Sequence, residues 1–109
     1  MHAMKPEQSD VQIRYKILQA VYRGARERKS DAYRLIPDLL GYTYSEMNYH
    51  LRYMKSKGLL SFTPRMLMRS YTITLLPPGK SVVEDFEAAF FSESPERDQR
   101  MKDALAILK

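Results

Sequence analysis

The chain has 109 residues, enough for one modest hydrophobic core but not for two, so we expect a single folding unit. It contains no cysteine, which excludes disulfides, thiolate zinc sites and cysteine nucleophiles. The hydrophobic content of 44% is typical of a folded chain, and neither a membrane-spanning apolar run nor a signal peptide is visible. We therefore expect a cytoplasmic protein without a membrane partner.

The net charge of +5 is distributed unevenly along the chain. Residues 1–80 carry a net charge of +8, whereas residues 81–109 carry −3. A basic surface confined to the first part of the chain suits the neutralisation of nucleic-acid phosphates, which would repel the acidic remainder. The alternative is that these lysines and arginines only solvate the surface.

Apolar residues at helical spacing predict a first helix over residues 8–22, with Gly24 at its end. Val11 and Val21 would face the core, and Arg14 would face outward. The basic stretch that follows, residues 23–30, is expected to be a connection that either contacts phosphates or is simply solvated.

Residues 31–40 begin with suitable cap residues and have an apolar face at helical spacing. Pro37 argues against one continuous helix, because proline removes a backbone donor and clashes with the preceding turn, at a cost of about 3 kcal/mol or more. We therefore expect two short helical pieces, residues 31–35 and 37–40, followed by a turn at residues 41–42.

The clearest helix signal lies in residues 43–58, where both ends are marked. Thr43 and Glu46 have the spacing of a capping box, and Gly58 can take the left-handed conformation that ends a helix. The apolar residues fall on one face at helical period: Met47, Leu51 and Met54. The opposite face and its flank carry hydrogen-bonding groups, an aromatic ring and a guanidinium: Ser45, Asn48, Tyr49, Arg52 and Ser56. His50 lies at the edge of the apolar face and is expected to be a partly buried structural histidine.

Two β-rich runs, residues 59–63 and 70–74, flank a six-residue tip at residues 64–69 and predict a hairpin. The tip has an apolar centre of two methionines and a leucine, between Arg65 and Arg69. We expect the apolar centre either to be exposed for binding or to fold onto the domain or a partner chain.

A helix pair followed by a hairpin occupies the middle of the chain, with M-N-Y-H-L-R-Y-M-K-S-K-G-L-L at residues 47–60 and Y-T-I-T at residues 71–74. This order resembles the winged-helix domain, and in particular ArsR- and MarR-like transcriptional regulators and small archaeal winged-helix proteins. The resemblance implies an α+β fold, mainly α with a small β-hairpin. Residues 1–80 would form a winged helix-turn-helix, and residues 81–109 would add two C-terminal helices.

The resemblance further implies a sequence-specific, double-stranded DNA-binding transcriptional regulator, with the second helix of the pair in the major groove. Asn48 and Arg52 are the best candidates for base edges, since Asn can bond adenine and Arg guanine bidentately. Ser45 and Tyr49 are expected at phosphate or a thymine methyl group, and the hairpin arginines at the backbone or a narrow minor groove. The candidate DNA-binding residues are Tyr44, Ser45, Asn48, Tyr49, Arg52, Arg65 and Arg69.

The alternative function is a protein-interaction winged helix, in which the methionine-rich hairpin tip and an exposed tyrosine surface contact another protein. The tyrosines expected to be exposed are Tyr42, Tyr44, Tyr49 and Tyr53. The charge favours DNA, because an interaction module has no need of +8 in its first 80 residues.

Two further helices are expected after the hairpin, one over residues 81–92 and one that begins with the cap signal at Ser94 and Pro95. Their apolar stripes either pack back on the domain or, as in the resembled families, pair two copies into a homodimer. The candidate dimerisation residues are Phe86, Phe90, Met101, Leu105 and Leu108.

Enzyme chemistry finds little support in the sequence. His2 and His50 are the only histidines, and neither has the spacing of a catalytic triad or a metal site. Glu84, Asp85 and Glu87 are expected to form a solvated helix face rather than a carboxylate site. We therefore expect no enzyme activity, no metal and no cofactor.

Overall fold

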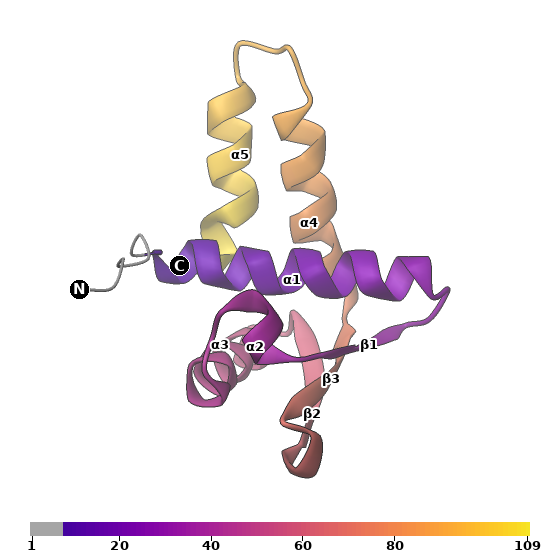
Figure 1. Cartoon of the computed structure of the whole chain (residues 1–109). Helices are drawn as coiled ribbons and strands as arrows, with labels where there is room; N and C mark the ends of the chain where they lie inside the picture. The colour runs from indigo at the N-terminus through magenta and orange to yellow at the C-terminus, as the bar shows by residue number, and fades with distance from the viewer. Residues whose placement is uncertain (1–7) are drawn as a thin grey trace, which may run out of the picture.

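A long helix, α1 (Asp10–Glu27), crosses the middle of the molecule and separates two groups of elements (Figure 1). The sheet, α2 and α3 lie on one side of it, and the pair α4 and α5 rises on the other. The computed structural model describes residues 8–109, so His2 and the segment inspected for a signal peptide lie outside the described residues. Over residues 8–109 the chain is an α+β protein, and no helix in that range is long and apolar enough to cross a bilayer.

The remaining elements follow in chain order: β1 (Ala32–Leu35), α2 (Pro37–Leu40), α3 (Tyr44–Ser56), β2 (Leu60–Arg65), the 3-10 turn η1 (Met66–Met68), β3 (Ser70–Leu75), α4 (Pro77–Phe90), α5 (Arg97–Leu105) and the 3-10 turn η2 (Ala106–Leu108). The strands form an antiparallel sheet in the order β1-β3-β2. The core lies where α1, α3 and the sheet meet, with Leu108 from the C-terminal end inside it.

Helix α1 begins at a capping box between Ser9 and Gln12 and continues through Gly24, so the predicted helix end at Gly24 is wrong. The ring of Tyr33 covers this glycine, and a Cβ there would lie 2.4 Å from the ring carbon Cε1 of Tyr33. Gly24 therefore permits close packing of β1 on α1. Sequence patterns alone do not separate this role from that of a helix end.

Residues 32–35 were expected to be helical and instead form β1, so the fold has a three-stranded sheet rather than a hairpin alone. Ile36 precedes Pro37, a position at which the α conformation is disfavoured, and this prevents a helix from running into α2. Pairing with β3 satisfies the backbone groups of β1 that face β3, and the other side of β1 is an edge of the sheet. The predicted second piece is confirmed as α2, with Pro37 at its start, although Leu39 is 79% exposed and does not join the expected apolar face.

Helix α3 agrees closely with its prediction. The Thr43 hydroxyl accepts from the Glu46 backbone N–H, and the Glu46 carboxylate accepts from the Thr43 N–H, both at 3.0 Å. Gly58 has the expected left-handed backbone, with φ of 74°. The predicted apolar face is completely buried: Met47, Leu51 and Met54.

The hairpin is confirmed, but its tip is shorter than predicted. Pro64 and Arg65 belong to β2, where they pair with Tyr71 and Ser70 of β3. The tip is therefore η1, closed by Arg69 in a left-handed conformation with φ of 48°.

Helix α4 starts at Pro77, four residues earlier than Ser81, because prolines are tolerated in a first turn where N–H groups have no helical partner. The expected boundary between residues 80 and 81 thus falls inside α4. Helix α5 starts at Arg97, after a turn at Pro95. Leu108 is fully buried in the core of its own chain, so it is not available to a second copy as the dimerisation set required.

We predict that Gly79→Ala lowers the free energy of unfolding by about 3 kcal/mol or more, at or above the upper end of ordinary overpacking. A Cβ at this position would lie 2.1 Å from the Leu59 carbonyl oxygen, and a backbone atom cannot move aside as a side chain can. The control is Gly58→Ala, which has open space and should cost only the left-handed backbone penalty of about 1 kcal/mol. Urea denaturation compares them; equal losses would contradict the close approach.

Candidate nucleic-acid interface

The outer face of α3 presents a row of polar side chains. Ser45, Tyr49 and Arg52 are exposed, and their spacing places them on one side of the helix, as predicted. Asn48 lies on the flank and is half-buried. The buried apolar face behind them fixes the rotation of α3, so this polar row must point away from the core.

Tyr44 joins α3 to the hairpin and is less exposed than expected. Its ring stacks on that of Tyr71, with centroids 4.4 Å apart, and the Tyr71 hydroxyl donates to the Tyr44 carbonyl oxygen at 3.2 Å. Burial raises the pKa of the Tyr71 hydroxyl, so it remains a donor. The Tyr44 hydroxyl in turn donates to Met66 Sδ at 3.3 Å. These contacts hold the hairpin tip beside the N-terminal end of α3.

The two predicted arginines lie on the hairpin, and a third arginine, from β1, contacts the hairpin tip. Arg65 and Arg69 are exposed, and Arg65 Nε donates to Thr72 Oγ1 at 3.4 Å. Arg34, which was not predicted, reaches Met68 Sδ at 3.4 Å. Arg34 alternates with the buried Leu35 along the strand, a signal that the helical prediction for residues 31–35 hides.

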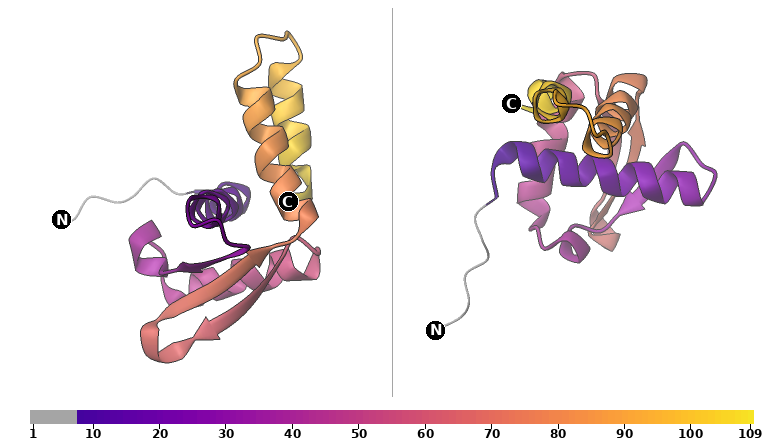
Figure 2. Two further views of the ribbon diagram at one scale, coloured as in Figure 1. Left: turned by 90° about the vertical axis from the view of Figure 1, so that its right-hand side faces the viewer. Right: turned by 90° about the horizontal axis from the view of Figure 1, so that it is seen from above.

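A long acid-free stretch of the chain includes most of α3 and the whole hairpin, although Asp38 on α2 and Glu46 in the first turn of α3 are exposed on the same side of α1. Residues 47–83 contain no Asp or Glu. Five of their cations belong to α3, its C-terminal end and the hairpin: Arg52, Lys55, Lys57, Arg65 and Arg69. The sixth, Lys80, belongs to α4. The hairpin extends beyond α3 on the side away from α4 and α5 (Figure 2). The acidic residues of the C-terminal part of the chain are therefore carried by elements on the opposite side of α1.

Arg14 lies behind α3 and corrects the expectation that it faces outward. The residue is 3% exposed. Its Nη1 donates to the Leu108 carbonyl oxygen at 2.7 Å, and its Nε donates to His50 Nδ1 at 3.2 Å. The guanidinium also lies 3.6 Å from the centre of the Tyr53 ring. The Asp10 carboxylate oxygen Oδ2 lies 3.7 Å from Arg14 Nη2. One buried cation thus links α1, α3 and the C-terminal turn.

These contacts also change two other expectations. His50 is buried rather than at a partly exposed edge, and it accepts a hydrogen bond from Arg14, which requires Nδ1 to be unprotonated. Tyr42 was expected to be exposed but is 8% exposed, and its hydroxyl donates to Gln8 Oε1 at 2.9 Å. Tyr53 is half-buried under Arg14, which leaves Tyr49 as the exposed tyrosine of the four.

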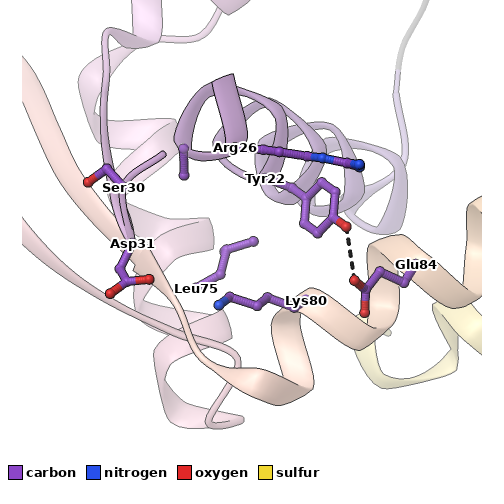
Figure 3. A pocket seen from close by; sticks show the side chains of 8 residues that line it. Tyr22, Arg26, Ser30, Asp31, Leu75, Lys80 and Glu84 are labelled. Carbon is purple, nitrogen blue, oxygen red and sulfur yellow. Dashed lines mark hydrogen bonds between the residues drawn. The ribbon is translucent and has the colours of Figure 1, made fainter. Parts of the chain in front are cut away.

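A cavity of about 230 Å³ lies between the C-terminal end of α1 and the N-terminal end of α4 (Figure 3). Its lining mixes signs of charge, and the Tyr22 hydroxyl at one side donates to Glu84 Oε2 at 2.9 Å. The charged residues that line it are Arg26, Asp31, Lys80 and Glu84. Within residues 8–109, no group of three or more His, Cys, Asp or Glu side chains could hold a metal ion.

No family model, curated protein or solved structure matches the chain. The candidate site is therefore defined by the side chains of α3, the hairpin and β1, and by the charge around them.

We predict that lowering the pH destabilises the protein through His50. Burial is the main cause that lowers the pKa of His50 below its ordinary 6.5, and the neighbouring Arg14 cation lowers it further. The carboxylates of Asp10 and Glu46 act in the opposite direction, with a smaller effect. In the unfolded chain the imidazole takes up a proton near pH 6.5, whereas in the folded chain its protonation requires a lower pH. Stability is thus fully present above that pH. It falls as the pH drops toward the folded pKa, by at most about 1.4 kcal/mol per pH unit.

Urea denaturation at several pH values from about 7.5 to 5.5 measures this effect. The matched control is His50→Gln, whose amide oxygen can still accept from Arg14 but does not titrate. A pH dependence that is identical in the two proteins would show that His50 is not the titrating group.

Proposed function

We propose that the protein is a winged-helix, double-stranded DNA-binding transcriptional regulator. The observation that carries the proposal is the polar row of α3 beside a cation-bearing hairpin, in a part of the chain that has no carboxylate side chain between Glu46, in the first turn of α3, and Glu84. Duplex DNA carries one negative charge per about 1.7 Å of axis, so the cations of α3 and the hairpin suit this partner.

In this proposal α3 enters the major groove, which is wide enough to admit a helix. Arg52 is exposed and can bond guanine O6 and N7 bidentately, and Asn48 on the flank can bond adenine. Ser45 and Tyr49 contact phosphate or a thymine methyl group. The hairpin is then the wing, and Arg65 and Arg69 reach the backbone on the adjacent groove.

We further propose that the protein acts as a homodimer through α4 and α5, which project away from α3 (Figure 1). Phe91 is 77% exposed, Phe90 is exposed beside it, and the two rings are 5.1 Å apart. A two-fold axis through this pair of helices would keep both α3 helices free for successive major grooves, about 34 Å apart. Phe86 and Met101 are half-buried on the same pair of helices.

The wing arginines test the function most simply. Replacing Arg65 and Arg69 together by Ala should weaken binding to every duplex and reduce the slope of log K against log salt by roughly 0.9 per lost phosphate contact. Arg100→Ala with Lys102→Ala on α5 is the matched control and should leave the slope unchanged. If the parent protein shows no salt-dependent binding to duplex DNA, the proposed function is wrong and a protein partner becomes the better candidate.

Arg52→Ala tests sequence readout separately from phosphate contact. On a preferred site obtained from a random duplex library, we expect a loss of about 1–3 kcal/mol and relaxed preference at one base pair. Binding isotherms on the preferred and substituted sites measure both quantities. A uniform loss on all sequences would reassign Arg52 to the backbone.

Phe90→Ser combined with Phe91→Ser should convert a dimer to a monomer in light scattering, because both exposed rings lose their apolar surface. Deletion of residues 94–109 is unsuitable here, since it would remove the buried Leu108 and the carbonyl bonded to Arg14. Leu39→Ser, at a leucine on α2 that is about as exposed as Phe91, is the control. A parent protein that is monomeric at tens of micromolar would exclude the dimer.

A further inference from the structure

The outermost point of the hairpin is apolar, which is unusual for a surface surrounded by cations. Three consecutive large apolar side chains, Met66, Leu67 and Met68, are all exposed, and Leu67 is completely so at 102%. Exposed apolar clusters of this kind mark interaction sites on proteins that are otherwise well packed. Base readout by the polar row of α3 does not require an apolar hairpin tip. The tip therefore has a role of its own.

Contacts on both sides hold the tip in one shape. The Tyr44 hydroxyl donates to Met66 Sδ, and Arg34 Nη1 donates to Met68 Sδ, so each methionine is tied to a different element. The backbone N–H of Arg69 donates to the Met66 carbonyl oxygen at 3.2 Å, which closes the turn with Arg69 left-handed. Leu67 lies between these two methionines and is the most exposed of the three side chains.

The charges around the tip select the partner. Arg34, Arg65 and Arg69 lie at or next to η1, and the whole hairpin lacks carboxylates. An apolar apex with cations at its base matches the minor groove of a duplex, whose floor is formed by base edges and whose walls are formed by phosphates. Side chains such as leucine and methionine can enter between base pairs there and partly unstack them.

We propose that Met66–Met68 is an apolar wedge that enters the DNA minor groove, and that Leu67 partly unstacks one base step and bends the duplex toward the major groove. This inference rests on the proposed function, since it requires the wing to lie on DNA. The wedge favours flexible pyrimidine–purine steps such as TA, which unstack easily, over stiff A-tracts. It therefore adds a sequence preference that no hydrogen bond to a base supplies.

The experiment uses the full chain and two duplexes of about 24 base pairs, one alternating TA and one a continuous A-tract. Both carry 2-aminopurine in place of some adenines, because its fluorescence rises when a base is unstacked. We expect the parent protein to raise the emission of the alternating duplex roughly threefold, to leave the A-tract nearly unchanged, and to bind the alternating duplex more tightly.

Leu67→Ala should remove most of the emission increase and most of the preference between the two duplexes, while retaining salt-dependent binding. Leu67→Phe keeps an apolar wedge and should retain the emission increase. Leu39→Ala, at an exposed leucine far from the tip in sequence, should behave as the parent protein. Circular dichroism of each variant establishes that it is folded.

The outcomes separate the two proposals. Salt-dependent binding without any rise in emission, or a rise that Leu67→Ala does not reduce, would overturn the wedge and leave DNA binding intact. If the parent protein and Leu67→Ala bind each duplex with equal affinity, the tip does not contact DNA. That result would overturn the wedge and favour a protein partner for the tip. Absence of binding to either duplex at low salt would overturn the wedge and the proposed function together.

Discussion

The buried guanidinium of Arg14 is the constraint on which the arrangement of the molecule depends. A cation removed from water without partners costs several kcal/mol, so α1, α3 and the C-terminal turn must meet at one place to supply an imidazole nitrogen, a carbonyl oxygen and an aromatic face. Because His50 lies on the buried side of α3, this contact also fixes the rotation of the helix. The polar row of Ser45, Tyr49 and Arg52 points outward as a consequence.

A second set of contacts extends that rigid body to the hairpin. The stack of Tyr44 on Tyr71 and the bond from the Tyr71 hydroxyl join the first turn of α3 to β3. Gly79 lets α4 approach the backbone of Leu59 at the other end of the same hairpin. The candidate interface and the α4–α5 pair are thus fixed on opposite sides of α1, which suits a division between DNA contact and self-association.

Local signals in the sequence were sufficient for the elements that need no partner. The Thr43–Glu46 capping box, the helix-ending Gly58 and the break at Pro37 each depend on neighbours within a few residues, and each is confirmed. Charge was equally readable, because the absence of acids around the hairpin is a property of the chain itself.

The start of α4 at Pro77 was missed for a local reason, but the larger errors concern residues whose state is decided by distant parts of the chain. Arg14 was expected outside because its partners lie 36 and 94 residues away. Residues 32–35 fit helical spacing, yet pairing with β3, about 40 residues later, makes them a strand. The spacing of Leu108 places it on an apolar stripe that could face a second copy, but in the structure the turn after α5 packs Leu108 into the core of its own chain. The candidate residues were therefore found more easily than the contacts that orient them.

Amide hydrogen exchange of the full chain with and without duplex DNA tests most directly whether α3 and the hairpin form the DNA-binding face. If they do, protection on binding is concentrated in residues 44–52 and 65–70 and is absent from the exposed amides of the α4–α5 connection. Protection confined to α4 and α5, or none in α3 at saturating DNA, would contradict this assignment.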